Sequence, residues 1–171
     1  MRRLNLAILV SLLFNCCNLW AQVSADPAKQ SVFKVFELFF ESMQNRDTVS
    51  LKKIIRSQSS VFFMSWKTES EDMIITGGGG GSFKGFMNSV GNPDGMYGKC
   101  RNEFNDFEIH LYEGIAIVSA KYWCFLDGIN KNNCGRYIIQ FQKSPNNDVE
   151  EGFEWKVSKV DRIVFNKGLC D

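Results

Sequence analysis

Residues 153–165 form the last alternating segment of the chain, and one face of this segment carries both apolar and charged side chains. Successive side chains of a strand point to opposite faces, so Trp155, Val157, Lys159 and Asp161 share one face. If Trp155 and Val157 place that face inside, the Asp161 carboxylate is desolvated. Its pKa then rises toward the range of a general base that removes a proton next to a carbonyl. A strand twist or a bulge would instead turn Lys159 and Asp161 outward, where charged residues usually lie.

Two tyrosines in neighbouring predicted strands, Tyr122 and Tyr137, would donate a hydrogen bond to the oxyanion that forms in such a reaction. We take Asp161 and Tyr122 as the catalytic candidates. The single histidine, His110, is next to Ile109, which we expect to face inward, so the His110 side chain is expected on the opposite, outer face of the strand. Nothing in the sequence indicates a Ser-His-Asp or Cys-His relay.

Five consecutive glycines, residues 77–81, precede a short helical pattern that begins at Ser82. A glycine run before a helix is typical of a phosphate-binding loop, but that motif ends in Gly-Lys-Ser/Thr, and here Ser82 and Phe83 follow. We therefore expect a flexible loop at the rim of a site, where the hairpin of strands 61–66 and 73–76 ends.

The elements that position these residues begin with helices. Asp26 and Pro27 are typical N-cap and N1 residues, and they predict a helix over residues 27–45. Its apolar side chains at helical spacing are Val32, Val35, Phe36, Phe39 and Met43. Such a stripe is typical of core packing rather than of a cofactor site. Asp47 or Thr48 then caps a short second helix.

From residue 60 onward the hydrophobic period changes to two. This period predicts strands over residues 61–66, 73–76, 104–112, 115–126, 136–143 and 153–165. Two helices and a helical turn together with a curved antiparallel sheet predict an α+β fold, in which the first helix packs on one sheet face.

The N-terminus has the form of an export signal. Arg2 and Arg3 precede an almost uncharged run, and Ala21 is a small residue at which a signal peptidase would cut. The apolar span is too short for a stable membrane anchor, so we expect residues 1–21 to be removed and residues 22–171 to form one exported domain, periplasmic or secreted. An uncleaved membrane helix and acylation at Cys16 are the alternatives.

The charge balance excludes some partners. Loss of Arg2 and Arg3 reduces the Lys and Arg residues from 20 to 18, against 19 Asp and Glu residues. This near-neutral balance does not favour nucleic acid or anionic lipid as a partner.

No CxxC or Cys/His spacing indicates zinc, and 15 Phe supply a core without a metal, so we expect neither a metal nor a cofactor.

Cleavage of the signal also removes Cys16 and Cys17, so the cysteines of the mature chain are Cys100, Cys124, Cys134 and Cys170. Three complete pairings are possible in an oxidising compartment, and the sequence does not choose among them. Cys134 begins a strand and Cys170 lies at the tail, so a bridge between them would hold the C-terminus; we name it as a prediction. Cys124 by itself is typical of a small buried hydrophobe on a strand.

The chain resembles the nuclear transport factor 2-like superfamily over about residues 30–165. The segments that carry the resemblance are VFKVFELFFESMQNRDTVSLKKII, YEGIAIVSAKYWCFLDG, YIIQFQK and EWKVSKVDRIVF. More closely, the chain resembles small exported members from Bacteroidetes, in which a Cys-Gly strand opening and a C-terminal Cys recur, as Cys134, Gly135 and Cys170 do here. The resemblance implies a cone-shaped curved antiparallel sheet packed on a long N-terminal helix and one or two shorter helices. Members include ketosteroid isomerase-like, SnoaL-like and scytalone dehydratase-like proteins, so function must be argued from the site.

The resemblance also implies a ligand pocket between the first helix and the concave sheet face, and alternation predicts its lining. The predicted pocket residues are Phe36, Phe39, Met43, Tyr122, Cys124, Tyr137, Ile139, Phe141, Trp155, Val157, Lys159 and Asp161. The catalytic Asp and His residues of the superfamily's isomerases and dehydratases have no position-for-position match here.

Three functions follow from these observations. The aromatic content and the weak acid/base constellation favour an exported protein that holds a small apolar or aromatic ligand in the cone. The second is a cofactor-free lyase or isomerase of the ketosteroid isomerase-like type, which depends on Asp161. The third is an interaction module that forms a homodimer through its open sheet face.

Overall fold

The structure is a computed structural model that describes residues 26–56, 63–68, 75–95, 97–126, 130–144 and 155–165. The predicted signal peptide, residues 1–21, lies outside the described residues, as does Cys170. None of the helices in these ranges is long and apolar enough to cross a bilayer.

Among the described residues, three helices pack against the sheet, and each begins at a side-chain cap. Helix α2 spans Pro27–Gln44, and the Asp26 side chain accepts a hydrogen bond from the Ala28 amide at 2.9 Å. Helix α3 spans Thr48–Ile54, where Asp47 caps the Val49 and Ser50 amides. Helix α4 spans Phe83–Gly91 and is capped by Ser82. The caps satisfy amide groups that have no partner within the helix, so the helices begin where the sequence predicts.

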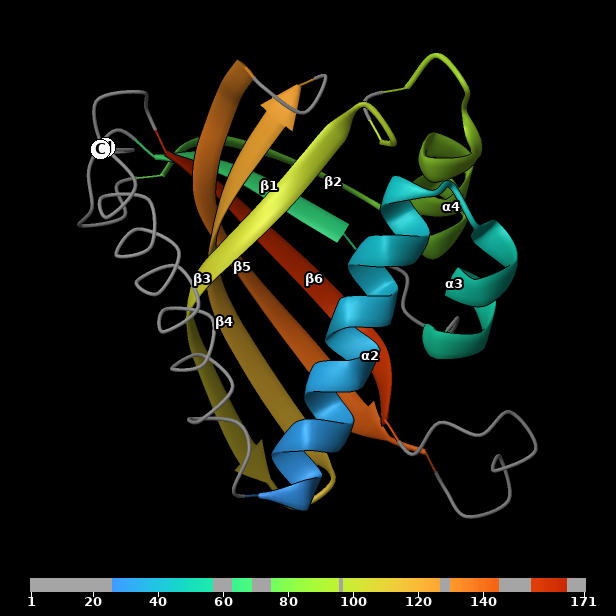
Figure 1. Ribbon diagram of the computed structural model, residues 1–171, viewed down its shortest axis with the longest axis vertical. Coiled ribbons are helices and arrows are strands. Elements are labelled where there is room, and N and C mark those ends of the chain that lie inside the picture. The colour runs from blue at the N-terminus through green and yellow to red at the C-terminus, as the bar shows by residue number, and fades with distance from the viewer. Residues whose placement is uncertain are drawn as a thin grey trace, which may run out of the picture.

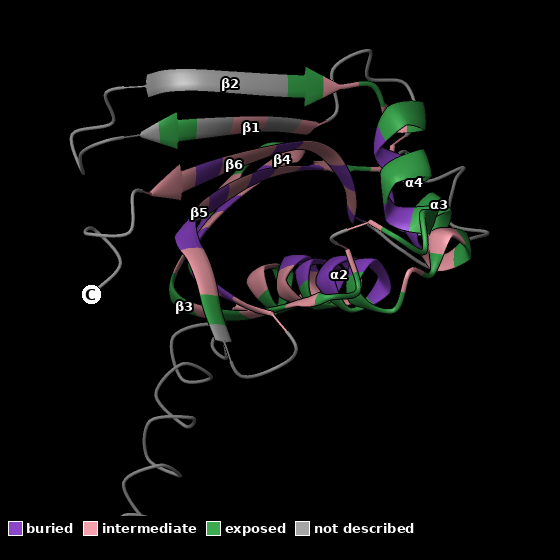
Figure 2. Cartoon of the chain, turned by 90° about the horizontal axis from the view of Figure 1, so that it is seen from above, coloured by how far each residue is buried: buried purple, intermediate pink, exposed green. Residues whose placement is uncertain are grey.

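In the part of the chain that the structure describes, six strands form one sheet in the order β2-β1-β6-β5-β4-β3. Their bounds are β1 Phe63–Thr68, β2 Ile75–Gly81, β3 Cys100–Tyr112, β4 Ile115–Leu126, β5 Asn130–Lys143 and β6 Trp155–Phe165. The sheet is curved, and α2 lies along its concave side with α3 and α4 at one end (Figures 1 and 2). This arrangement confirms the α+β cone. One pairing differs from the predicted antiparallel sheet: strands β1 and β6 run parallel to each other.

The glycine run does not form the predicted loop. Residues 77–81 belong to β2 and pair antiparallel with β1, in a register that joins Phe63 to Gly81 and Lys67 to Gly77. β2 lies at one edge of the sheet, so its backbone pairs with β1 on one side only. Backbone pairing thus overrides the low strand propensity of glycine.

The core lies between α2 and the concave face of β3, β4, β5 and β6. Alternation predicted the inward faces of β4 and β5 correctly, since Val118, Ala120, Ile139 and Phe141 are fully buried. Ala116 and Ala120 on β4 are fully buried. The aromatic side chains of α2 pack against rings of the sheet, Phe36 against Phe104 and Phe40 against Tyr137. Phe36, Phe39 and Met43 are all buried, so the aromatic stripe of α2 is core, as its spacing indicates.

Candidate functional site

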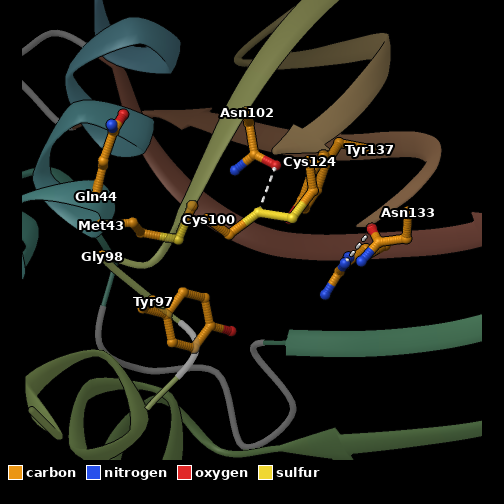
Figure 3. A pocket seen from close by; sticks show the side chains of 10 residues that line it. Met43, Gln44, Tyr97, Gly98, Cys100, Asn102, Cys124, Asn133 and Tyr137 are labelled. Carbon is orange, nitrogen blue, oxygen red and sulfur yellow. Dashed lines mark hydrogen bonds between the residues drawn. A yellow bond between two sulfur atoms is a disulfide. The ribbon is translucent and has the colours of Figure 1, made fainter. Parts of the chain in front are cut away.

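A pocket of about 180 Å³ lies between the C-terminal end of α2 and the sheet. Its lining residues come from α2, the loop before β3, and strands β3 to β6 (Figure 3). They are Met43, Gln44, Tyr97, Gly98, Cys100, Asn102, Cys124, Asn133, Tyr137 and Arg162. The lining contains one cation, Arg162, and no carboxylate from the described part of the chain.

An irregularity in β6 decides which charged residue enters the cone. Val157 pairs with Phe141 and Lys159 pairs with Gln140, so β6 takes two steps where β5 takes one, and Ser158 is the extra residue. The Ser158 hydroxyl donates to the Gln140 carbonyl at 3.1 Å. An extra residue reverses the face of every side chain that follows it.

Beyond the bulge, Val160 is fully buried opposite Ile139, and Arg162 pairs with Tyr137 on the inner face. Lys159 and Asp161 consequently lie on the outer face, where Lys159 Nζ and Asp161 Oδ2 are 2.9 Å apart. This finding corrects the prediction that both reach the cavity. The Asp161 carboxylate is absent from the pocket lining, so the geometry does not support its role as a general base there.

Arg162 is held in place by hydrogen bonds to neutral groups. Its Nε donates to the Tyr122 hydroxyl at 2.9 Å, and its Nη2 donates to Asn133 Oδ1 at 2.8 Å. The guanidinium carbon also lies 5.3 Å from the centre of the Tyr122 ring. Both donors are fixed by partners on β4 and β5, so the guanidinium is oriented before any ligand enters.

Three tyrosines surround this cation and stay neutral near pH 7. Burial raises the pKa of Tyr97, Tyr122 and Tyr137 above the ordinary value, although the Arg162 charge partly opposes that rise. Burial lowers the pKa of Arg162, but the hydrogen bond to Tyr122 and the Coulombic attraction of the three tyrosines once they ionise raise it, and the net direction is upward. The pocket therefore carries one positive charge and no compensating negative charge within the described residues.

A disulfide between Cys100 and Cys124 forms part of the wall and joins the start of β3 to β4. Cys124 is buried on a strand, as expected, and its sulfur is bonded to Cys100. The Asn102 Oδ1 atom lies 3.7 Å from Cys100 Sγ, a contact rather than a hydrogen bond, because a disulfide sulfur carries no hydrogen. Cys134 is also in a disulfide. Its pairing with Cys170 stays a prediction, because Cys170 lies outside the described residues.

The loop that carries Tyr97 is anchored to the end of α2. Arg46 Nε donates to the Tyr97 carbonyl at 2.9 Å. Gly98 has a φ of +83°, and a β-carbon there would lie 3.1 Å from the Gln44 carbonyl oxygen, so only glycine fits without strain. In Figure 3 the Tyr97 ring lies across the pocket from the disulfide, with its hydroxyl pointing toward the side on which Asn133 lies.

The predicted pocket residues fall into three groups. Met43, Cys124 and Tyr137 line the pocket, and Tyr122 supports it through Arg162. The core residues that do not line it are Phe36, Phe39, Ile139, Phe141, Trp155 and Val157. Lys159 and Asp161 form the third group, on the outer face.

Sequence reasoning missed Arg162, Tyr97, Asn102 and Asn133. One signal could have found Arg162: the apolar Val160 has the wrong parity for a strand that starts with Trp155 and Val157, which indicates a bulge between them. His110 is exposed and lies 3.7 Å from Glu108, in agreement with the expectation of a surface position. No cluster of metal-binding side chains occurs among the described residues.

No protein-family model matches the sequence, and no curated protein matches it significantly. Solved structures do match the fold. A nuclear transport factor 2-like protein from Cytophaga hutchinsonii is 14% identical with a TM-score of 0.57, over 80% of this chain and 97% of that chain. The S. rosetta CaMKII hub is 14% identical with a TM-score of 0.58, over 82% of this chain and 98% of that chain.

A third solved structure is a nuclear transport factor 2-like superfamily protein from Salmonella enterica. It is 16% identical with a TM-score of 0.54, over 81% of this chain and 91% of that chain. Likeness at this level of identity extends to the fold and leaves the chemistry open. The protein has the nuclear transport factor 2-like fold.

Proposed function

We propose that this protein is an exported small-molecule-binding protein whose ligand occupies the pocket around Arg162. The observation that carries the proposal is an oriented cation in a concave site that no acidic side chain of the described residues neutralises. Recognition sites typically combine apolar walls with a few fixed polar groups, and this pocket has both. The sequence alone favoured an apolar or aromatic ligand, and the pocket adds a polar anchor to that expectation.

Export is part of the proposal. The Cys100–Cys124 disulfide is compatible with an oxidising compartment, in which such bonds persist, and the N-terminal sequence has the form of a signal peptide. Both cysteines of this disulfide line the pocket, so the proposed binding site contains a bond that such a compartment preserves.

An isomerase or lyase activity has less support. Proton abstraction needs a base within hydrogen-bond reach of the substrate. The carboxylate proposed for that role, Asp161, pairs with Lys159 on the outer face, and His110 is exposed. Among the described lining residues, none is a carboxylate or a histidine.

Native mass spectrometry of the secreted protein tests the proposal. An Asn102→Trp variant fills the pocket, and Glu103→Trp is its matched control, because Glu103 is the next residue of β3 and its side chain is 53% exposed. We expect the wild type and Glu103→Trp to retain a small molecule that Asn102→Trp lacks. A retained molecule at equal level in all three proteins, or in none of them, would contradict the proposal. A dimer mass would support the interaction module in its place if no molecule is retained.

A further inference from the structure

The hydrogen-bonding capacity of Arg162 is only partly used within the chain. A guanidinium carries five N–H donors. In the described part of the chain Arg162 uses one on Tyr122 and one on Asn133, and no carboxylate pairs with it. The side chain lines the pocket, so the unused donors are within reach of a ligand.

A desolvated positive charge without a partner is unfavourable, and an anion that enters the pocket relieves that cost. The tyrosine hydroxyls around the guanidinium orient it but carry no charge. The Arg162 charge repels cationic ligands, and no acidic side chain of the lining offsets that repulsion, so the site discriminates against them.

The Tyr137 hydroxyl is a second donor at the same place. Tyr137 lies directly opposite Arg162 in the β5–β6 register, and its side chain is 3% exposed and lines the pocket. Within the described residues, its hydroxyl makes no hydrogen bond. A planar carboxylate has two oxygens, one for the guanidinium fork and one for this hydroxyl.

The rest of the pocket suits a small apolar body. Met43, the Cys100–Cys124 disulfide and the Tyr97 ring supply its walls. A volume of about 180 Å³ corresponds to roughly six water molecules at about 30 Å³ each, which is the bulk of a benzoate-sized ion. A phosphate would leave this space unfilled and would meet only one cation.

We infer that the ligand is a small organic monocarboxylate, bound through Arg162 and Tyr137 with its apolar body against Met43 and the disulfide. This inference rests on the proposed function and specifies its ligand class.

Isothermal titration calorimetry with four probes tests the inference. Benzoate and butyrate present the carboxylate, benzamide is the neutral isostere of benzoate, and inorganic phosphate is an anion without an apolar body. We expect a carboxylate to bind at least about 10-fold more tightly than benzamide, since hydrogen bonds to charged groups are the stronger kind. Phosphate is expected to bind more weakly than either carboxylate. This comparison uses the wild-type protein and needs no variant to fold.

Variants then locate the contact. Arg162→Gln should weaken carboxylate binding by about 10- to 100-fold and change benzamide binding by less than about 3-fold. Tyr137→Phe should weaken carboxylate binding by about 3- to 10-fold. Arg101→Gln is the control, because Arg101 is 57% exposed, pairs with Glu103 and does not line the pocket. If Arg162→Gln does not fold, Arg162→Lys replaces it and should show an intermediate loss.

Three results would overturn the inference. The first is that benzamide binds as tightly as benzoate, and the second is that phosphate binds more tightly than both carboxylates. The third is that Arg162→Gln binds carboxylates with unchanged affinity. No binding of either carboxylate would overturn it as well. The proposed function is decided separately, by whether Asn102→Trp loses a retained molecule that Glu103→Trp keeps.

Discussion

Tyr122 on β4 accepts a hydrogen bond from Arg162 on β6 at 2.9 Å, although β5 runs between these two strands. The bond crosses β5 beside Gly135, which pairs with Tyr122 and has no side chain to obstruct it. A β-carbon at Gly135 would lie 3.0 Å from Tyr122 Cε1 and would also collide with the Ile163 carbonyl. The missing side chain at one position of β5 therefore allows the contact that orients the pocket's cation.

Gly135→Ala should destabilise the protein by about 1–3 kcal/mol, the usual range for an added group in a packed site. The cause is the collision with the Ile163 carbonyl, which backbone movement must relieve. Urea unfolding followed by circular dichroism measures the change. Gly81→Ala in β2 is the control, because its β-carbon would meet nothing within 4 Å, and we expect equal or slightly higher stability. Equal effects of the two substitutions would contradict the role given to Gly135.

Replacement of Cys100 and Cys124 together by serine should lower the free energy of unfolding by about 3 kcal/mol. The disulfide closes a loop with a sequence separation of 24 and so restricts the unfolded chain. Chemical denaturation of the double variant and the wild type measures the loss, with a reducing agent added to a second wild-type sample. The reducing agent also cleaves the disulfide of Cys134, so the reduced wild type should be at least as destabilised as the variant. A variant as stable as the oxidised wild type would show that the bond contributes nothing.

Stability should fall under alkaline conditions because burial raises the pKa of Tyr137. The native state then holds the phenolic proton more tightly than the unfolded chain, whose tyrosine pKa is about 10. This contribution is complete below about pH 10 and is lost as the pH rises toward the native pKa, by up to about 1.4 kcal/mol per pH unit.

Urea unfolding at about pH 8 and about pH 11 measures this dependence. Tyr137→Phe is the comparison, because phenylalanine cannot ionise while other titrating groups stay the same. The variant should lose less stability than the wild type between the two pH values. Equal losses would mean that the Tyr137 proton does not contribute.

Asp161→Asn should leave ligand binding unchanged and cost less than about 1 kcal/mol of stability, as partly exposed ion pairs usually do. The reason is the outward position of Asp161, which is paired with a Lys159 side chain that is 44% exposed. Calorimetry with benzoate and urea unfolding measure the two effects, and Lys159→Gln should behave in the same way. A loss of affinity comparable to that of Arg162→Gln would place Asp161 in the pocket and contradict the bulge in β6.

Local chemistry was sufficient to predict most of the elements. Asp26, Asp47 and Ser82 satisfy amides of their own helices, and strand alternation in β4 depends on residues two positions apart, so short windows of sequence contain this information. The glycine run was misjudged because its strand pairing with β1 is supplied by a different segment of the chain.

The residues of the pocket were only partly predictable from local patterns. The sequence by itself determined an inward face for Tyr122, Cys124 and Tyr137, because β4 and β5 keep their alternation through these positions. Only the tertiary structure decided that Arg162, rather than Asp161, faces the pocket. One extra residue, Ser158, reverses the side-chain direction for the rest of β6, and whether a strand accommodates such a residue depends on its register with its neighbour. The alternation of side chains within β6 does not specify that register, because the partner strand β5 is a different segment of the chain.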